Sequence, residues 1–199
     1  MYLLYNGFFD RLRKFYFSKI LRSCHLPGGA KVLDYGCGPG DLLLVARALG
    51  LAATGIDASP RSVELAKKRG LDVILGDENL FDPKKDQFDV IVMQSVVEHI
   101  PDPMAVITKL SELLKPGGQM IVSAPTPGPY FWDDPTHIRP STPKSLRTLG
   151  EIAGLKVERV SYVFSFLLGF TLRSSIIYRL MNLLPLPLGS NLVAFYEKR

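Results

Sequence analysis

The sequence predicts an α/β protein built on a doubly wound parallel sheet, and two observations lead to that prediction. Short apolar stretches alternate with segments of helical periodicity, giving five predicted strands and three predicted helices between residues 31 and 124. The 199 residues are 47% hydrophobic and 22% charged, a composition that suits one domain with a substantial core. In such a sheet, ligands bind at the carboxyl ends of the strands.

Each element of the alternation has its own signal in the sequence. Near-continuous apolar runs predict strands buried in a parallel sheet. Ser59-Pro60 and Pro103 are typical helix starts, and Gly50 and the turn 115–118 end helices. The predicted strands are 31–35, 52–57, 72–75, 88–93 and 119–124, and the predicted helices between them are 41–49, 60–69 and 103–114. After a polar and aromatic loop over 125–143, we expect a helix to about residue 153 and two last strands, 155–162 and 191–197.

Charge and cysteine content narrow the classes of function. The net charge of +5 is moderate, and no set of stacking aromatics lies among clustered basic residues, so we expect no nucleic-acid partner. Cys24 and Cys37 form neither a metal pattern nor a disulfide framework, which favours the reducing cytoplasm. We expect no signal peptide and no membrane-spanning helix, because charged residues soon follow the apolar start and no uncharged apolar run reaches about 18 residues.

The stretch 31–40, KVLDYGCGPG, carries the strongest chemical signal. An apolar run leads into three glycines at alternate positions, Gly36, Gly38 and Gly40, and a helical pattern begins directly after them. Glycines permit positive φ and remove side chains that would block a ligand. The first free amides of the new helix then point into the gap, which is how a nucleotide-like cofactor is held. The spacing differs from the Gly-x-Gly-x-x-Gly of dinucleotide-binding proteins.

Asp57 ends the second predicted strand, in the sequence TGIDASP. A carboxylate at the tip of the strand beside the glycine turn can accept hydrogen bonds from both hydroxyls of a ribose. Its separation from Gly40 is close to the ~20 residues expected for such a pair. The alternative is that Asp57 caps the helix that follows, although Ser59 already offers that cap.

Residues 32–40, VLDYGCGPG, resemble the first motif of the class I S-adenosylmethionine-dependent methyltransferases. Asp77, the loop 94–103 with its Glu-His pair before a proline, and the Leu-Lys-Pro-Gly-Gly turn are similar to later features of the same family. The resemblance implies a Rossmann-like seven-stranded sheet in the order 3-2-1-4-5-7-6, with strand 7 antiparallel. It also implies transfer of a methyl group from S-adenosyl-L-methionine to an O, N or C nucleophile of a small acceptor, with S-adenosyl-L-homocysteine as the product.

The same resemblance suggests which residues contact the cofactor. Asp77 lies where the family places an acidic residue near the adenine, with a polar turn as the alternative. The full set of expected cofactor residues is Asp34, Gly36, Cys37, Gly38, Gly40, Asp57, Ala58, Asp77, Glu78, Gln94 and Ser95.

Two histidines follow the fourth and fifth predicted strands and should therefore lie on the cofactor edge. His137 and His99 are each a candidate general base for an acceptor that loses a proton, or else a structural hydrogen-bonding residue of its loop. The loop over 125–143 supplies the expected substrate-binding residues, Tyr130, Trp132, Asp134 and Arg139. Asp134 and Arg139 have the equal alternative of pinning that loop.

A metal is not expected from the sequence. The ubiquinone-pathway O-methyltransferases, one subset of the family, can hold a divalent metal through a Glu-His pair and a second glutamate four residues before the histidine. Glu98 and His99 match that pair, but Ser95 stands at the third position.

Two segments lie outside the resemblance, within what we expect to be one domain over residues 1–199. Residues 1–28 predict an N-terminal helical cap with a basic side and an apolar stripe of Phe8, Leu12, Phe15, Ile20 and Leu21. Residues 163–189 predict an apolar helical insertion between the last two strands. This insertion can lie in a membrane interface, close over a hydrophobic or lipid-linked acceptor, form a homodimer contact, or pack on the sheet.

Two other functions stay open at this point. One is a degenerate protein that binds the cofactor and acts through interactions alone. The other is an NAD-dependent oxidoreductase, which the glycine spacing disfavours.

Overall fold

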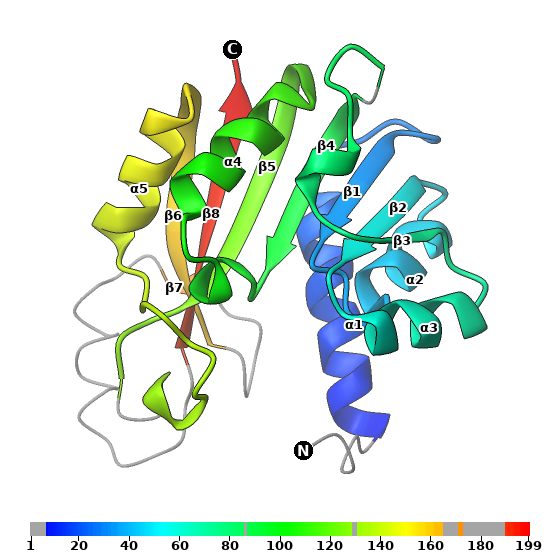
Figure 1. The fold of residues 1–199 in the computed structure, drawn as a ribbon, viewed down its shortest axis with the longest axis horizontal. Coiled ribbons are helices and arrows are strands. Elements are labelled where there is room, and N and C mark those ends of the chain that lie inside the picture. Colours follow the sequence, from blue (N-terminus) through cyan, green and yellow to red (C-terminus); the bar gives the residue numbers. More distant parts are fainter. Residues whose placement is uncertain (1–6, 86, 129–130, 165–170, 173–189) are drawn as a thin grey trace.

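The computed structural model describes residues 7–85, 87–128, 131–164, 171–172 and 190–199 (Figure 1). Its strands are β1 (Lys31–Tyr35), β2 (Ala52–Asp57), β3 (Val73–Leu75), β4 (Phe88–Gln94), β5 (Leu114–Pro125), β6 (Leu155–Phe164), β7 (Thr171–Leu172) and β8 (Ser190–Lys198). Its helices are α1 (Gly7–Arg22), α2 (Asp41–Ala48), α3 (Pro60–Lys68), α4 (Pro103–Glu112) and α5 (Pro143–Ile152), with 3₁₀ turns η1 (Glu78–Leu80), η2 (Val97–His99) and η3 (Phe131–Asp133).

The strands form one mixed sheet in the order β3-β2-β1-β4-β5-β8-β6-β7. Strands β1 to β5 pair in parallel, and β8 runs antiparallel to both β5 and β6. The predicted order is confirmed, with β8 as the seventh strand of the prediction. The two-residue strand β7 adds an edge by pairing with β6 at Tyr162 and Val163.

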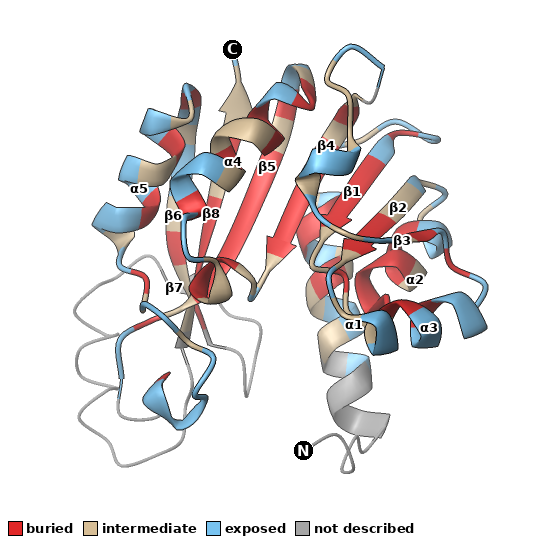
Figure 2. Ribbon diagram, in the orientation of Figure 1, coloured by how far each residue is buried: buried red, intermediate tan, exposed pale blue. Residues whose placement is uncertain are grey.

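Helices cover both faces of the sheet, as the doubly wound prediction requires (Figure 1). Alternate residues of β4 point to opposite cores: Ile91 and Met93 pack with α4 and α5, whereas Val90 and Val92 pack with α1 and α2. The central strands are accordingly buried over most of their length (Figure 2). This burial leaves the carboxyl ends of β1, β2, β4 and β5, and the loops that follow them, as the place where polar groups gather.

Helix α1 confirms part of the N-terminal prediction. Ile20 and Leu21 are buried against the sheet, together with Phe17. Phe15 was wrongly assigned to the apolar stripe, because its side chain is 62% exposed. The register of the helix explains this, since Phe17, Ile20 and Leu21 follow the three-to-four-residue spacing of one face and Phe15 falls outside it.

Strand β5 begins earlier than predicted. It includes the segment 115–118, which the sequence analysis treats as a turn before the strand. A register shift between Phe88 and Val90 in the pairing of β4 with β5 accommodates these residues.

The insertion between the last predicted strands is only partly described. Residues 163–164 extend β6 and residues 171–172 form β7, so these parts are strand where a helical insertion was expected. The helical pattern expected over 176–184 lies outside the described residues. None of the described helices is long and apolar enough to span a bilayer.

Candidate cofactor and acceptor site

The glycine turn joins the carboxyl end of β1 to the start of α2. Gly36, Gly38 and Gly40 have φ angles of 74°, 52° and 84°, all in the left-handed region that side chains disfavour. A Cβ on Gly36 would lie 2.3 Å from a methyl of Val96, and one on Gly40 would lie 2.3 Å from a methyl of Leu71. A Cβ on Gly38 would meet nothing within 4 Å. Two glycines therefore permit close packing, and the middle one faces open space.

Asp57 fixes the shape of this turn from the neighbouring strand. One of its carboxylate oxygens accepts a hydrogen bond from the amide of Gly38 at 2.8 Å, and the other accepts from the amide of Ser59 at 2.8 Å. The cap of α3 is Ser59, whose side chain accepts from the amide of Ser62. A carboxylate has about four acceptor positions, so each oxygen of Asp57 can accept one further hydrogen bond.

Two more carboxylates lie close to the same turn. Asp34 is 2% exposed, and burial, with the nearby charges of Asp57 and Asp41, raises its pKa to about 8. Asp41, at the start of α2, forms ion pairs with Arg13 of α1 at 2.5 Å and with Arg69 at 2.8 Å. Sequence reasoning missed Asp41 and its two arginines, because nothing in the local pattern shows that α1 and the end of α3 both reach it. Burial thus favours the protonated form of Asp34 at neutral pH, and two arginines offset the charge of Asp41.

Asp77 and Glu78 follow β3 and already have partners. One oxygen of Asp77 accepts from the amide and the side chain of Asn79, both at 2.9 Å, and the backbone bond holds the pKa of this carboxyl below its usual range. Glu78 accepts a hydrogen bond of 2.5 Å from the hydroxyl of Tyr35. The polar-turn alternative thus accounts for these contacts, and one oxygen of Asp77 is left for a ligand.

The end of β4 carries a strained residue and a buried acceptor. Ser95 has a φ of 53°, an uncommon conformation for a residue other than glycine, and its amide donates to the carbonyl of Ser123. The amide nitrogen of Gln94 donates to the hydroxyls of Ser95 and Ser123, whereas its buried Oε1 has no partner among the described residues. An unpartnered acceptor at the carboxyl end of a central strand is a place where a ligand can donate.

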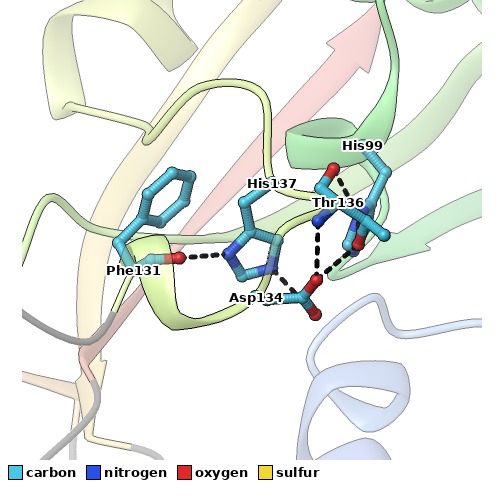
Figure 3. A network of polar contacts seen from close by, with 5 residues as sticks. All are labelled: His99, Phe131, Asp134, Thr136 and His137. Carbon is cyan, nitrogen blue, oxygen red and sulfur yellow. Dashed lines mark hydrogen bonds and ion pairs between the residues drawn. The ribbon is translucent and has the colours of Figure 1, made fainter.

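The two histidines lie side by side although they come from different loops (Figure 3). Their ring centroids are 4.9 Å apart. His137 contacts the carbonyl of Phe131 through Nδ1 at 2.7 Å, and its Nε2 lies 3.9 Å from a carboxylate oxygen of Asp134. His99 contacts the carbonyl and the hydroxyl of Thr136 through Nδ1.

Glu98 joins these histidines from within η2. Its side chain is 1% exposed, and one of its carboxylate oxygens, Oε2, has no hydrogen-bond partner among the described residues. Burial raises the pKa of this carboxyl to about 7. The carbonyl of Glu98 accepts from the amide of Ile138, which ties η2 to the loop after β5. In the sequence, Glu98 is recognisable only as part of a motif, since no local signal shows that it is buried.

The expected substrate residues fall into three groups. Trp132 is 62% exposed and stacks edge-on against Phe131, so its ring is available to a ligand. Asp134 accepts from the amide and hydroxyl of Thr136, and Arg139 donates to the carbonyl of Pro101 at 2.6 Å, so both pin the loop. Tyr130 lies outside the described residues. Among the other expected residues, the side chain of Cys37 belongs to the core and Ala58 is exposed.

The sequence profile of the methyltransferase domain family matches residues 8–160, which is most of the chain. The chain therefore belongs to the methyltransferase family. The solved structures that share its fold include SAM-dependent methyltransferases.

Solved structures share the fold. A SAM-dependent methyltransferase from Archaeoglobus fulgidus superimposes with a TM-score of 0.68 at 22% identity and covers 98% of this chain and 100% of that one. A TehB-like SAM-dependent methyltransferase from Corynebacterium glutamicum gives 0.64 at 21% identity, with 92% and 88% covered.

Curated relatives are similar over a shorter stretch. The ubiquinone biosynthesis O-methyltransferase of Xanthomonas axonopodis pv. citri is 36% identical over 104 residues, which cover 49% of this chain and 44% of that protein. The protein of the same name from Xylella fastidiosa is 37% identical over 102 residues, or 48% and 42%. The match thus spans less than half the length of these relatives.

The residues present fit S-adenosylmethionine. Open space above Gly38 lets a ligand approach the backbone, the buried Oε1 of Gln94 can accept from it, and the carboxylate of Asp57 can accept from its hydroxyl groups. When bound, this cofactor supplies a methyl group on a positively charged sulfur, and the leaving group is neutral.

Proposed function

We propose that this enzyme methylates an oxygen of a small, hydrophobic acceptor, with the cofactor held between the glycine turn and Asp57. The cofactor side of the proposal rests on the three left-handed glycines and the acceptor positions that Asp57 keeps open. Asp34, Gln94 and Ser95 complete the contacts at the ends of β1 and β4. Cys37, Ala58, Asp77 and Glu78 line the remaining edge.

We assign removal of the acceptor's proton to the histidines. The observation that carries the proposal is the contact between Nδ1 of His137 and the carbonyl of Phe131. A carbonyl can only accept, so Nδ1 holds the ring proton and Nε2 keeps a free lone pair. His137 can therefore remove a proton from an acceptor hydroxyl as the methyl group is transferred. His99 is held by Thr136 in the same tautomer and serves as the second candidate.

The acceptor side of the site supports a hydrophobic molecule. The ring of Trp132 is mostly exposed on the loop that also carries His137. An aromatic ring on the rim gives an apolar acceptor a surface to pack against. The names of the curated relatives, O-methyltransferases of ubiquinone biosynthesis, agree with an oxygen as the methylated atom.

The experiment is a transfer assay with radiolabelled S-adenosylmethionine and a panel of phenols that differ in the length of an attached alkyl chain. We expect turnover that increases with the alkyl chain and falls about 100-fold or more in His137→Gln, because a general base contributes roughly that factor. Binding of S-adenosylhomocysteine should be unchanged in this variant. Equal turnover by the variant, or preference for the shortest phenol, contradicts the proposal.

A further inference from the structure

Three hydrogen-bond acceptors converge at the rim of the site. One ring nitrogen of His99, one of His137 and one carboxylate oxygen of Glu98 lie within 4.8 Å of one another. They come from two segments, η2 and the loop after β5, that are 38 positions apart in the chain and are joined by the bond from Ile138 to Glu98.

Neighbouring oxygens select the tautomer of both histidines. Nδ1 of His137 faces the carbonyl of Phe131 at 2.7 Å, and Nδ1 of His99 faces the carbonyl of Thr136 at 3.2 Å. The hydroxyl of Thr136 donates to Asp134 at 2.6 Å, so it too accepts from His99. Both rings therefore carry the proton on Nδ1, and both keep an unshared lone pair on Nε2. A metal-ligating histidine is oriented in this way by the hydrogen bond of its other nitrogen.

Glu98 supplies the acidic member of the group. It is 1% exposed, and its Oε2 has no partner among the residues that the structure describes. A buried carboxylate oxygen without a donor carries a desolvation cost that a cation removes. Asp134, whose carboxylate lies 3.9 Å from Nε2 of His137, adds further negative charge at the exposed side.

We propose that Glu98, His99 and His137 bind one divalent transition-metal ion of the Zn²⁺ class. Two imidazoles and one carboxylate suit Zn²⁺, Co²⁺ or Mn²⁺, whereas Mg²⁺ prefers oxygen ligands. Ligands at ~2.1 Å from an ion are at most about 4 Å apart, so the widest separation closes by small side-chain rotations. His137 thus stands in for the ligand missing at Ser95, a contact between distant loops that no sequence spacing shows.

The metal site deepens the proposed function and rests on it in one respect. In the metal-free protein, His137 would act as the base. In protein that holds the ion, His137 would be a ligand, and the ion would supply a positive charge that lowers the pKa of the acceptor hydroxyl, whose proton would pass to water. Metal binding itself does not depend on which acceptor is used, so it can be measured without turnover.

The test titrates the full chain, after treatment with EDTA, with Zn²⁺ in a calorimeter and with Co²⁺ in a spectrophotometer. We expect one Zn²⁺ per chain at a dissociation constant of about 10 µM or lower, and visible Co²⁺ absorption that Zn²⁺ abolishes. Glu98→Gln and His137→Gln should each weaken Zn²⁺ binding at least tenfold, since even residues that only orient ligands contribute 10–100-fold.

The matched control is His25→Asn, which removes an exposed histidine far from the cluster. His25 has a φ of 52°, a conformation that asparagine tolerates. This control should bind Zn²⁺ like the wild type. Binding of S-adenosylhomocysteine by every variant reports a folded cofactor site. The proposal is overturned if the wild type binds no Zn²⁺, or if Glu98→Gln and His137→Gln bind it as tightly as the wild type. Failure of the wild type to bind S-adenosylhomocysteine would instead count against the proposed function.

Discussion

The glycine turn (residues 35–41) and the histidine rim (Glu98, His99 and His137) lie at the same edge of the sheet but are assembled in different ways. In the glycine turn, the residues from Tyr35 to Asp41 are consecutive, and backbone conformation alone creates the open space above Gly38. In the histidine rim, Glu98 and His99 meet His137 because two hydrogen bonds tie distant loops together. One joins the backbone of Ile138 to that of Glu98, and the other joins the His99 ring to the carbonyl of Thr136. The first region therefore depends on consecutive residues, whereas the second depends on contacts between segments far apart in the chain.

The largest expected effect is at the middle glycine. A side chain at Gly38 has room in the structure but would enter the space left for the cofactor. Gly38→Val should weaken S-adenosylhomocysteine binding about 100-fold or more in calorimetry. It should lower the free energy of unfolding by only ~1–2 kcal/mol, the cost of the left-handed conformation. If the loss of binding free energy is no larger than the loss of unfolding free energy, Gly38 does not face the cofactor.

Asp57 gives the next largest effect. Asp57→Ala removes the acceptors for two backbone amides and for the proposed ribose contact, so we expect S-adenosylhomocysteine binding to weaken by about 1–3 kcal/mol. Asp72→Ala is the control, because Asp72 is exposed and accepts a hydrogen bond from Thr54, within β2 and three residues before Asp57. Equal affinities of the two variants would remove Asp57 from the site.

The charge in the glycine turn should also appear as a pH dependence of stability. The pKa of Asp34 is raised to about 8 in the folded protein, so between about pH 4 and pH 8 the folded state holds more protons than the unfolded state. The free energy of unfolding of the cofactor-free protein should therefore fall as the pH rises towards 8, by up to about 1.4 kcal/mol per pH unit.

Urea unfolding at pH 5.5 and pH 8 measures this difference, and Asp34→Asn should flatten it. Glu98 contributes with the same sign, because its pKa is raised to about 7. The double variant Asp34→Asn, Glu98→Gln should then be the least sensitive to pH. Stability that rises over this range in the wild type is the contrary result.

The smallest expected effect is at Arg139, and it distinguishes a residue that anchors the loop from one that binds the acceptor. Arg139 donates to the carbonyl of Pro101 and is exposed, so Arg139→Ala should cost no more than about 1 kcal/mol of stability. We expect a rise in KM of a few fold with little change in kcat, because the loop loses one of several anchors. A loss of 100-fold or more would show that Arg139 binds the acceptor directly.

The sequence predicts the first region better than the second for a physical reason. Alternating apolar and helical segments define the sheet, and the left-handed turn needs glycines at fixed positions, so both are visible locally. Glu98 has no distinguishing local pattern in the sequence, and its burial depends on the distant loop after β5 that carries His137. The same limit applies to Phe15, whose exposure depends on how α1 rotates against the sheet, and to residues 115–118, which β5 includes where its register with β4 shifts.

Calorimetry with S-adenosylhomocysteine and with NADH on the wild-type chain tests the central claim most directly. The glycine turn and its carboxylates predict one S-adenosylhomocysteine bound per chain at micromolar or lower concentration, and no response to NADH. Micromolar binding of NADH without any response to S-adenosylhomocysteine would contradict the account.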